Sequence, residues 1–217
     1  MSHASLLCTL GLGFMLVAAP TFPAQPAGRS AAIAALSAPD AATRADAIAW
    51  LANYGRPKDA DLLYDLLRDE SAKVRAYAET GLWALWGRSG NPKVDALMVR
   101  GVDEMNDAKL AEAAASFSRA IGIDPAFAEA WNKRATVYFL MHEYRKSIAD
   151  CREVLERNPR HFGALSGLGQ IYLALDEPEK ALGWFRRALE VNPNMSSVEY
   201  NVKAIEEMLR ARRGRMI

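Results

Sequence analysis

The sequence of 217 residues is poor in the residue types from which most catalytic and metal centres are built. It contains two cysteines, Cys8 and Cys151, and three histidines, His3, His142 and His161. Two cysteines exclude a disulfide framework and a zinc site with four cysteine ligands. No histidine has a second histidine four residues along the chain, which is the spacing of common helical zinc sites. We therefore expect no bound metal and no cofactor.

Net charge is also nearly absent, because 27 Lys and Arg stand against 26 Asp and Glu and leave +1 at pH 7. Domains that bind nucleic acid through bulk charge usually carry a marked basic excess, so we expect no nucleic-acid partner. Hydrophobic residues make up 51% of the chain, enough for the core of one medium domain or two small ones. Alternating apolar and polar runs bounded by turn residues are missing, which predicts an all-α protein.

The first 28 residues contain no Asp, Glu, Lys or Arg. Residues 6–19 are almost wholly apolar and a Pro/Ala-rich stretch follows, a pattern typical of a signal peptide and its cleavage region. At about 1.5 Å per residue this helix would measure about 21 Å, short of the roughly 30 Å hydrocarbon core of a bilayer. We predict that residues 1–28 are a signal peptide and processing region and that the protein is exported, to a bacterial periplasm. A retained membrane anchor and a buried helix are the alternatives.

An internal repeat starts after residue 93. Prolines 125, 159 and 193 recur at an interval of 34 residues, and apolar or small residues recur at matching positions before each of them. The spacing predicts two amphipathic helices per block, with helix stops at the prolines. The recurring positions are Leu165, Leu168, Gly169, Tyr172, Ala181, Phe185 and Ala188 in the third block, Trp131, Arg134, Ala135, Tyr138, Ser147, Cys151 and Val154 in the second, and Leu97, Arg100, Gly101, Glu104, Ala113, Phe117 and Ala120 in the first.

This pattern resembles the tetratricopeptide repeat (TPR) over about residues 94–193. The resemblance implies an α-solenoid with three repeats at 94–127, 128–161 and 162–195, and a capping helix at 196–213 closes the array within a domain of residues 94–217. Arg100 and Glu104 depart from the pattern, which expects an apolar residue and a tyrosine there. Cys151 occupies the interior position of Phe117 and Phe185, so we expect a small buried hydrophobe rather than a nucleophile.

The segment before the repeats has a shorter self-similarity at an offset of 31 residues, in which Arg44 matches Arg75 and Leu36 matches Leu67. It looks like two HEAT-like helical hairpins over residues 29–90; two unrelated helical hairpins are the alternative. Residues 87–92 are rich in Gly, Ser, Asn and Pro and predict a joint between the segments. We expect Trp83 and Trp86, three residues apart on one helical face, to pack against the first repeat.

His142 and His161 fall in predicted turns, the first between the helices of the second repeat and the second between repeats. Connecting segments almost always run over the surface, so we expect both histidines to be exposed.

In TPR arrays the first helix of each repeat lines a concave groove, and the resemblance implies that this groove binds an extended peptide or a partner's helix. Some co-chaperones of the family hold a terminal carboxylate with Lys, Asn and Arg in the groove, but Met98, Val102, Gly163 and Gly167 occupy those places here and Lys133 replaces an Asn. Alternatively, the apolar groove residues pack against residues 30–88 or against the end helix. By register, the lining residues are Met98, Val102, Met105, Asn132, Thr136, Phe139, Ser166 and Gln170.

These patterns favour a non-enzymatic protein–protein interaction module, exported and acting as a scaffold or assembly factor. The alternative is a scaffold attached to the membrane by an uncleaved leader and a basic tail of Arg210, Arg212, Arg213 and Arg215. That tail could equally be cations placed favourably at a helix C-terminus. An enzyme is the least favoured class, because no nucleophile elbow, phosphate loop or metal spacing is found.

Overall fold

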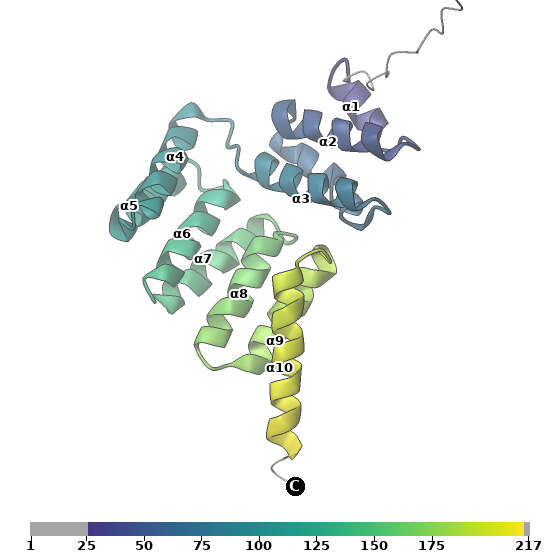
Figure 1. The fold of residues 1–217 in the computed structure, drawn as a ribbon. Helices are drawn as coiled ribbons and strands as arrows, with labels where there is room; N and C mark the ends of the chain where they lie inside the picture. The colour runs from purple at the N-terminus through teal and green to yellow at the C-terminus, as the bar shows by residue number, and fades with distance from the viewer. Residues whose placement is uncertain (1–25, 215–217) are drawn as a thin grey trace, which may run out of the picture.

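The computed structural model describes residues 26–214, in which all regular structure is helical, as the predicted α-solenoid requires (Figure 1). Residues 1–25 of the predicted signal peptide, with Cys8 and His3, lie outside the described residues, and so does Arg215 of the basic tail. No helix within residues 26–214 has the length and apolar character needed to cross a membrane.

The repeats form three antiparallel helical pairs followed by one long helix that lies along the last of them (Figure 1). Helices α5, α7 and α9 each end two residues before one of the three prolines, so the predicted helix stops are confirmed. The bounds are α4 Pro92–Asn106, α5 Leu110–Ile123, α6 Ala128–Leu140, α7 Tyr144–Arg157, α8 Phe162–Ala174, α9 Pro178–Val191 and α10 Ser196–Gly214.

The turn inside each repeat contains one residue in the left-handed backbone region. Ala108, His142 and Asp176 have φ values of 59°, 59° and 56°, and they are 34 residues apart. In each turn the next residue donates its N–H to the carbonyl five positions back, at 2.8, 2.8 and 2.9 Å. This bond closes the helix end and reverses the chain within a few residues. Since none of the three is glycine, composition gave no signal for this conformation.

The turn between repeats is built around the proline itself. Asp124, Asn158 and Asn192 precede the prolines, and each side chain accepts a hydrogen bond from the backbone N–H two residues on, at 3.0–3.1 Å. This bond fixes a local turn while the proline prevents the helix from continuing. The 34-residue period is therefore set by two backbone turns in every repeat.

The small residues predicted at helix contacts are confirmed at Gly101 and Gly169, which face the rings of Phe117 and Phe185. Both rings are fully buried. In the first repeat, Glu104 takes the place of a tyrosine, accepting hydrogen bonds from Ser116 Oγ at 2.6 Å and from Arg100 Nε at 2.7 Å. A polar network thus replaces the aromatic contact there.

The segment before the repeats, here called the N-terminal unit (residues 26–86), consists of α1 Arg29–Ala35, α2 Ala41–Tyr54, two 3₁₀ helices η1 Pro57–Leu62 and η2 Asp65–Arg68, and α3 Ala72–Trp86. The expectation of two complete α-helical hairpins is wrong for the second, whose first arm is η1 and η2. There the buried carboxylate of Asp59 accepts the Arg56 N–H at 2.9 Å and pairs with Arg29. Such a side-chain acceptor competes with α-helical bonding and favours a tight turn.

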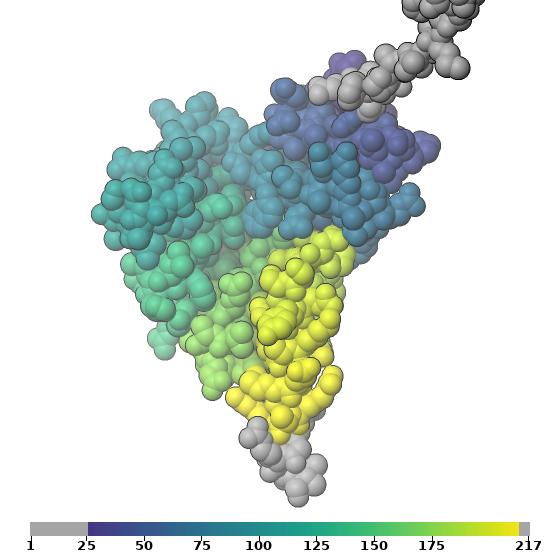
Figure 2. Space-filling model, in the orientation of Figure 1, coloured from purple at the N-terminus to yellow at the C-terminus, as the bar shows by residue number. Residues whose placement is uncertain are grey.

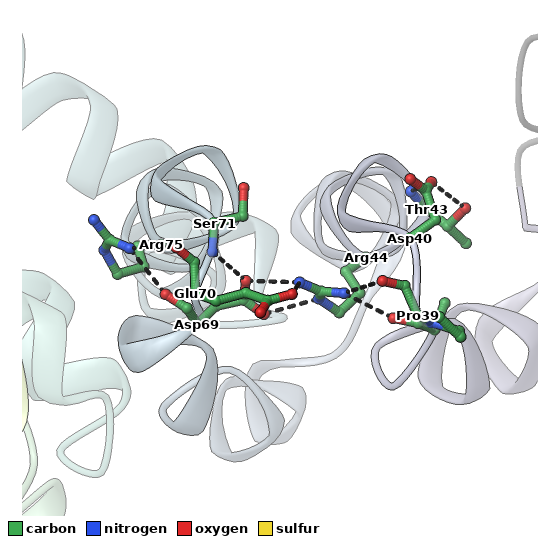
Figure 3. A network of polar contacts seen from close by, with 9 residues as sticks. Pro39, Asp40, Thr43, Arg44, Asp69, Glu70, Ser71 and Arg75 are labelled. Atoms are coloured by element: carbon green, nitrogen blue, oxygen red, sulfur yellow. Dashed lines mark hydrogen bonds and ion pairs between the residues drawn. The ribbon is translucent and has the colours of Figure 1, made fainter.

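Two arginines in equivalent positions tie the unit together (Figure 3). Arg44 Nη1 donates to the carbonyls of residues 38–39 at 2.8 and 2.9 Å, and Arg75 Nη1 donates to those of residues 69–70 at 2.9 and 3.1 Å. The Arg44 guanidinium also donates two hydrogen bonds of 2.8 Å to the Asp69 carboxylate. The 31-residue offset therefore repeats a structural contact, while its assignment to the HEAT-like class stays a prediction.

The N-terminal unit docks across the loops that join the repeats, and Figure 2 shows it in contact with the start of α10. Arg75 Nε donates to Asn194 Oδ1 at 3.0 Å, and Asn194 Nδ2 donates to the Leu67 carbonyl at 2.7 Å. Tyr64 Oη donates to Asn158 Oδ1 at 3.1 Å. The unit therefore contacts the loops after the second and third repeats.

The two tryptophans of α3 lie at this junction, but not where the sequence predicted. Trp83 and Trp86 pack on His161 and Phe162 at the start of the third repeat, with ring centroids 4.2–5.4 Å apart. The expectation that the pair packs against the first repeat is wrong for the ring contacts, which outside the N-terminal unit are made to His161 and Phe162, although Trp83 also lines a cavity with Met98 and Val102 of α4.

A glycine substitution tests the close helix approach. A Cβ added to Gly101 would come within 2.6 Å of the Phe117 ring, whereas one added to Gly183 meets nothing within 4 Å. We expect Gly101→Ala to lower the free energy of unfolding by about 1–3 kcal/mol, because the buried ring has to move. As the control, Gly183→Ala should raise it by about 0.5–1 kcal/mol. Chemical denaturation measures both, and equal effects of the two substitutions would contradict the assigned packing.

Candidate functional site

The groove formed by α4, α6 and α8 contains two cavities, and six of the eight predicted lining residues fall in them. Met98 and Val102 line an apolar cavity of about 430 Å³. Asn132, Thr136, Phe139 and Gln170 line a smaller hollow of about 60 Å³, here called the polar hollow after its Asn, Thr and Gln side chains. The other two, Met105 and Ser166, line neither cavity: Met105 packs into the core of the first repeat, and Ser166 is buried.

The apolar cavity has walls from both parts of the chain. Trp83 and Gly87 come from α3 and its end, and Met98, Val99 and Val102 come from α4. The Trp83 ring also lies against Gly163 at the start of α8, where any larger side chain would overlap it. Sequence reasoning missed Trp83, because it placed the groove within the repeats alone, and it also missed the exposed Val99 on α4.

The polar hollow offers hydrogen-bonding groups without net charge. Thr136 and Gln170 are exposed, while Asn132 is buried and donates to Glu129 Oε2 at 3.1 Å. Cys151 lies beneath this hollow, and burial raises the pKa of its thiol to about 12. The thiol therefore stays protonated near neutral pH, which confirms Cys151 as a buried hydrophobe and not a nucleophile.

His161 is not exposed, so the prediction of a surface histidine is wrong for this residue, although His142 does lie on the surface. His161 is 1% exposed, and its ring stacks on Trp86 with centroids 4.2 Å apart. Nδ1 accepts the N–H of Ala164 at 3.1 Å and caps α8. Since Nδ1 is an acceptor, the hydrogen lies on Nε2, and this N–H donates a hydrogen bond to Glu129 Oε2, 3.1 Å away.

Glu129 is a buried carboxylate that reaches both the groove and the junction. Burial raises the pKa of Glu129, but hydrogen bonds from His161 and from Lys133, whose Nζ lies 3.3 Å away, outweigh burial and hold the pKa below its ordinary value. The carboxylate is thus ionised at neutral pH and satisfied by its neighbours.

A third cavity, of about 400 Å³, lies at the junction between η1 and the loops around residues 126–129 and 157–161. Two of its cationic residues are engaged within the protein. Arg160 pairs with Asp61 at 2.7 Å and so links the repeats to the N-terminal unit, and Arg157 Nε donates to the Pro125 carbonyl within the repeats at 2.6 Å.

The described part of the chain holds no group of three or more His, Cys, Asp or Glu side chains that could bind a metal ion. The groove combines an apolar cavity, a neutral polar hollow and one buried ion pair. Such a surface suits reversible binding through apolar anchors and hydrogen bonds.

The repeats are similar in sequence to known proteins. Residues 127–194 match the tetratricopeptide repeat family model. A TPR repeat-containing protein of Rhizobium etli is 36% identical over 129 residues, which are 59% of this chain and 63% of that protein. The chain thus spans less than two thirds of that relative's length.

Solved structures share the fold. One is the first TPR of Spaghetti (RPAP3), bound to the HSP90 peptide SRMEEVD. It superposes with a TM-score of 0.53 and is 24% identical, over 54% of this chain and 94% of that one. The Sgt2 TPR domain from Aspergillus fumigatus gives a TM-score of 0.54 and 20% identity over 57% of this chain and 83% of that one. At these identities the likeness shows the fold alone.

The ionised Glu129 makes stability depend on pH. Because its pKa is lower in the folded chain than in the unfolded one, the carboxylate stabilises the fold above about pH 4.5, and this contribution is lost as the pH falls through the folded pKa. We expect the unfolding free energy of the wild type to fall more steeply between about pH 5 and 3 than that of Glu129→Gln. Denaturation at a series of pH values measures this.

Glu156→Gln is the matched control, because Glu156 is exposed on α7. It should keep the wild-type slope. Parallel slopes for the wild type and Glu129→Gln would show that the buried carboxylate contributes nothing as an ion.

Proposed function

We propose that the chain is a tetratricopeptide repeat protein and a non-enzymatic protein-interaction module whose concave groove binds an extended peptide of a partner protein, on the ground that residues 127–194 match the family model. The observation that supports this proposal most is the pair of cavities along α4, α6 and α8, which combine apolar and hydrogen-bonding surface. The first TPR of Spaghetti is bound to a peptide, so a domain of this fold can bind one. A role as scaffold or assembly factor follows if the groove recruits one protein to another.

Within the described residues, the N-terminal unit enters the groove at Trp83, whose ring lies against Gly163 and lines the apolar cavity. Thr136 and Gln170 remain exposed beyond that point, on neighbouring first helices. Surface of this kind is free to contact a partner.

A charge placed in the polar hollow tests the groove. We expect Thr136→Arg to weaken binding at least tenfold, about 1.4 kcal/mol, because the long cation fills the hollow. Peptides selected by the wild type from a random library displayed on phage serve as the probe, and fluorescence anisotropy measures Kd.

Ala149→Arg is the control, because Ala149 is exposed on the outer helix of the same repeat and lines neither cavity. It should bind as the wild type does, and both variants should keep the wild-type circular dichroism. An unchanged affinity of Thr136→Arg for the peptide would show that the groove is not the binding site.

We also propose that the protein is exported, on the ground that its first 28 residues carry no charged side chain and contain a 14-residue apolar run. N-terminal sequencing of protein from the producing cell tests this, and we expect a mature chain that begins near Gln25. An intact N-terminus in the membrane fraction would favour the alternative, a scaffold anchored by its leader.

The described arginines of the basic tail support the exported module over the anchored one. Arg210 lies 3.5 Å from Glu206 on α10, and Arg212 lies 3.7 Å from Asp176 in the turn before α9. Both therefore have carboxylate neighbours on the protein, and cations in this position also suit the C-terminal end of a helix.

A further inference from the structure

We infer that the apolar cavity between α3 and α4 is a composite anchor pocket that selects peptides carrying a large apolar residue next to a basic residue. This inference rests on the proposed function, since it names the peptide class that the groove takes. It differs from a groove made by repeats alone, because one wall comes from the N-terminal unit.

The pocket offers an apolar surface with no partner in the described chain. Val99 is 63% exposed although it stands beside Met98, Val102 and the ring of Trp83. Its volume, about 430 Å³, falls at the lower end of the range for ligand pockets, roughly 300–1,000 Å³. A cluster of exposed apolar side chains beside a tryptophan is typical of a binding surface.

The Trp83 wall is held rigidly. Its ring meets Phe162 edge-on at a centroid distance of 5.2 Å and Trp86 likewise at 5.2 Å, and Gly163 leaves it no room to move toward α8. A preformed wall loses little conformational entropy when a ligand side chain packs against it. Trp83 is therefore assigned as a specificity-determining residue of the pocket.

The charges around the pocket determine which charge a bound peptide should carry. Asp103 is exposed, and no side chain in residues 26–212 pairs with it. Glu129 is ionised, and Lys133 already pairs with it at 3.3 Å. Two carboxylates against one engaged ammonium leave the rim with a net negative charge. Such a rim attracts Lys or Arg and disfavours an acidic peptide end.

The test uses the full chain and a random peptide library displayed on phage, with the best binder then synthesised and capped at both ends. We expect the enriched peptides to share Leu, Ile, Met or Phe next to Lys or Arg. Asp103→Lys should bind the selected peptide at least tenfold more weakly than the wild type does. The same variant should bind more tightly a peptide in which Glu replaces the basic residue. Asp65→Lys, at an exposed aspartate on η2 that lines neither cavity, should change nothing.

Trp83→Ala should weaken binding at least tenfold, and Trp50→Ala, at a half-buried tryptophan of α2 that contacts Tyr54, is its control. Since Trp83→Ala also removes contacts at the junction, Val99→Lys provides a second variant on an exposed position that should fold normally. It should reject the basic peptide by at least tenfold as well.

The inference is overturned if the enriched peptides end in acidic residues, or if the charge preference is the same in Asp103→Lys and the wild type. Binding that Thr136→Arg abolishes but Val99→Lys and Asp103→Lys leave intact would overturn the pocket and retain the groove. If no selected peptide is sensitive to Thr136→Arg, the proposed function itself fails.

Discussion

The packing of α3 on the loop between the second and third repeats is the contact on which the rest of the structure depends. Trp86 stacks on His161, Trp83 meets Phe162 edge-on, and Arg75 reaches Asn194 on the next loop along. Aromatic contacts of this kind add to the free energy of burying large apolar surfaces. They join the N-terminal unit, which has a core of its own, to the repeats and make it one wall of the groove.

The repeats provide a surface that can accept this contact because their loops are built alike. A left-handed residue closes each turn within a repeat, and an Asp-Pro or Asn-Pro turn ends each second helix. Both turns fix the chain direction at the backbone level, so the first helices line up along one concave side. Where Glu104 replaces a tyrosine, hydrogen bonds from Ser116 and Arg100 preserve the same helix arrangement.

Local patterns in the sequence predicted the features that depend on local physics. Helix ends at the prolines, the contact of Gly101 with Phe117 and the burial of Cys151 followed from the 34-residue register. The docking of the N-terminal unit could not be predicted from the repeat pattern. It joins residues about 80 positions apart, and a repeat pattern carries no information on which distant side chains fit together. One feature of the sequence did indicate that His161 is buried. It stands in register with Phe127 and Met195, so a histidine occupies a position that is apolar in the other repeats.

A double-mutant cycle between Trp86 and His161 tests the docking contact most directly. The unfolding free energies of the wild type, Trp86→Leu, His161→Leu and the double variant give the coupling between the two side chains. The structure predicts a favourable coupling of about 0.5–1.5 kcal/mol, the size found for aromatic pairs in contact, within one cooperative transition. Additive effects of the two substitutions, or separate unfolding of the N-terminal unit, would contradict the assembly of both parts into one groove.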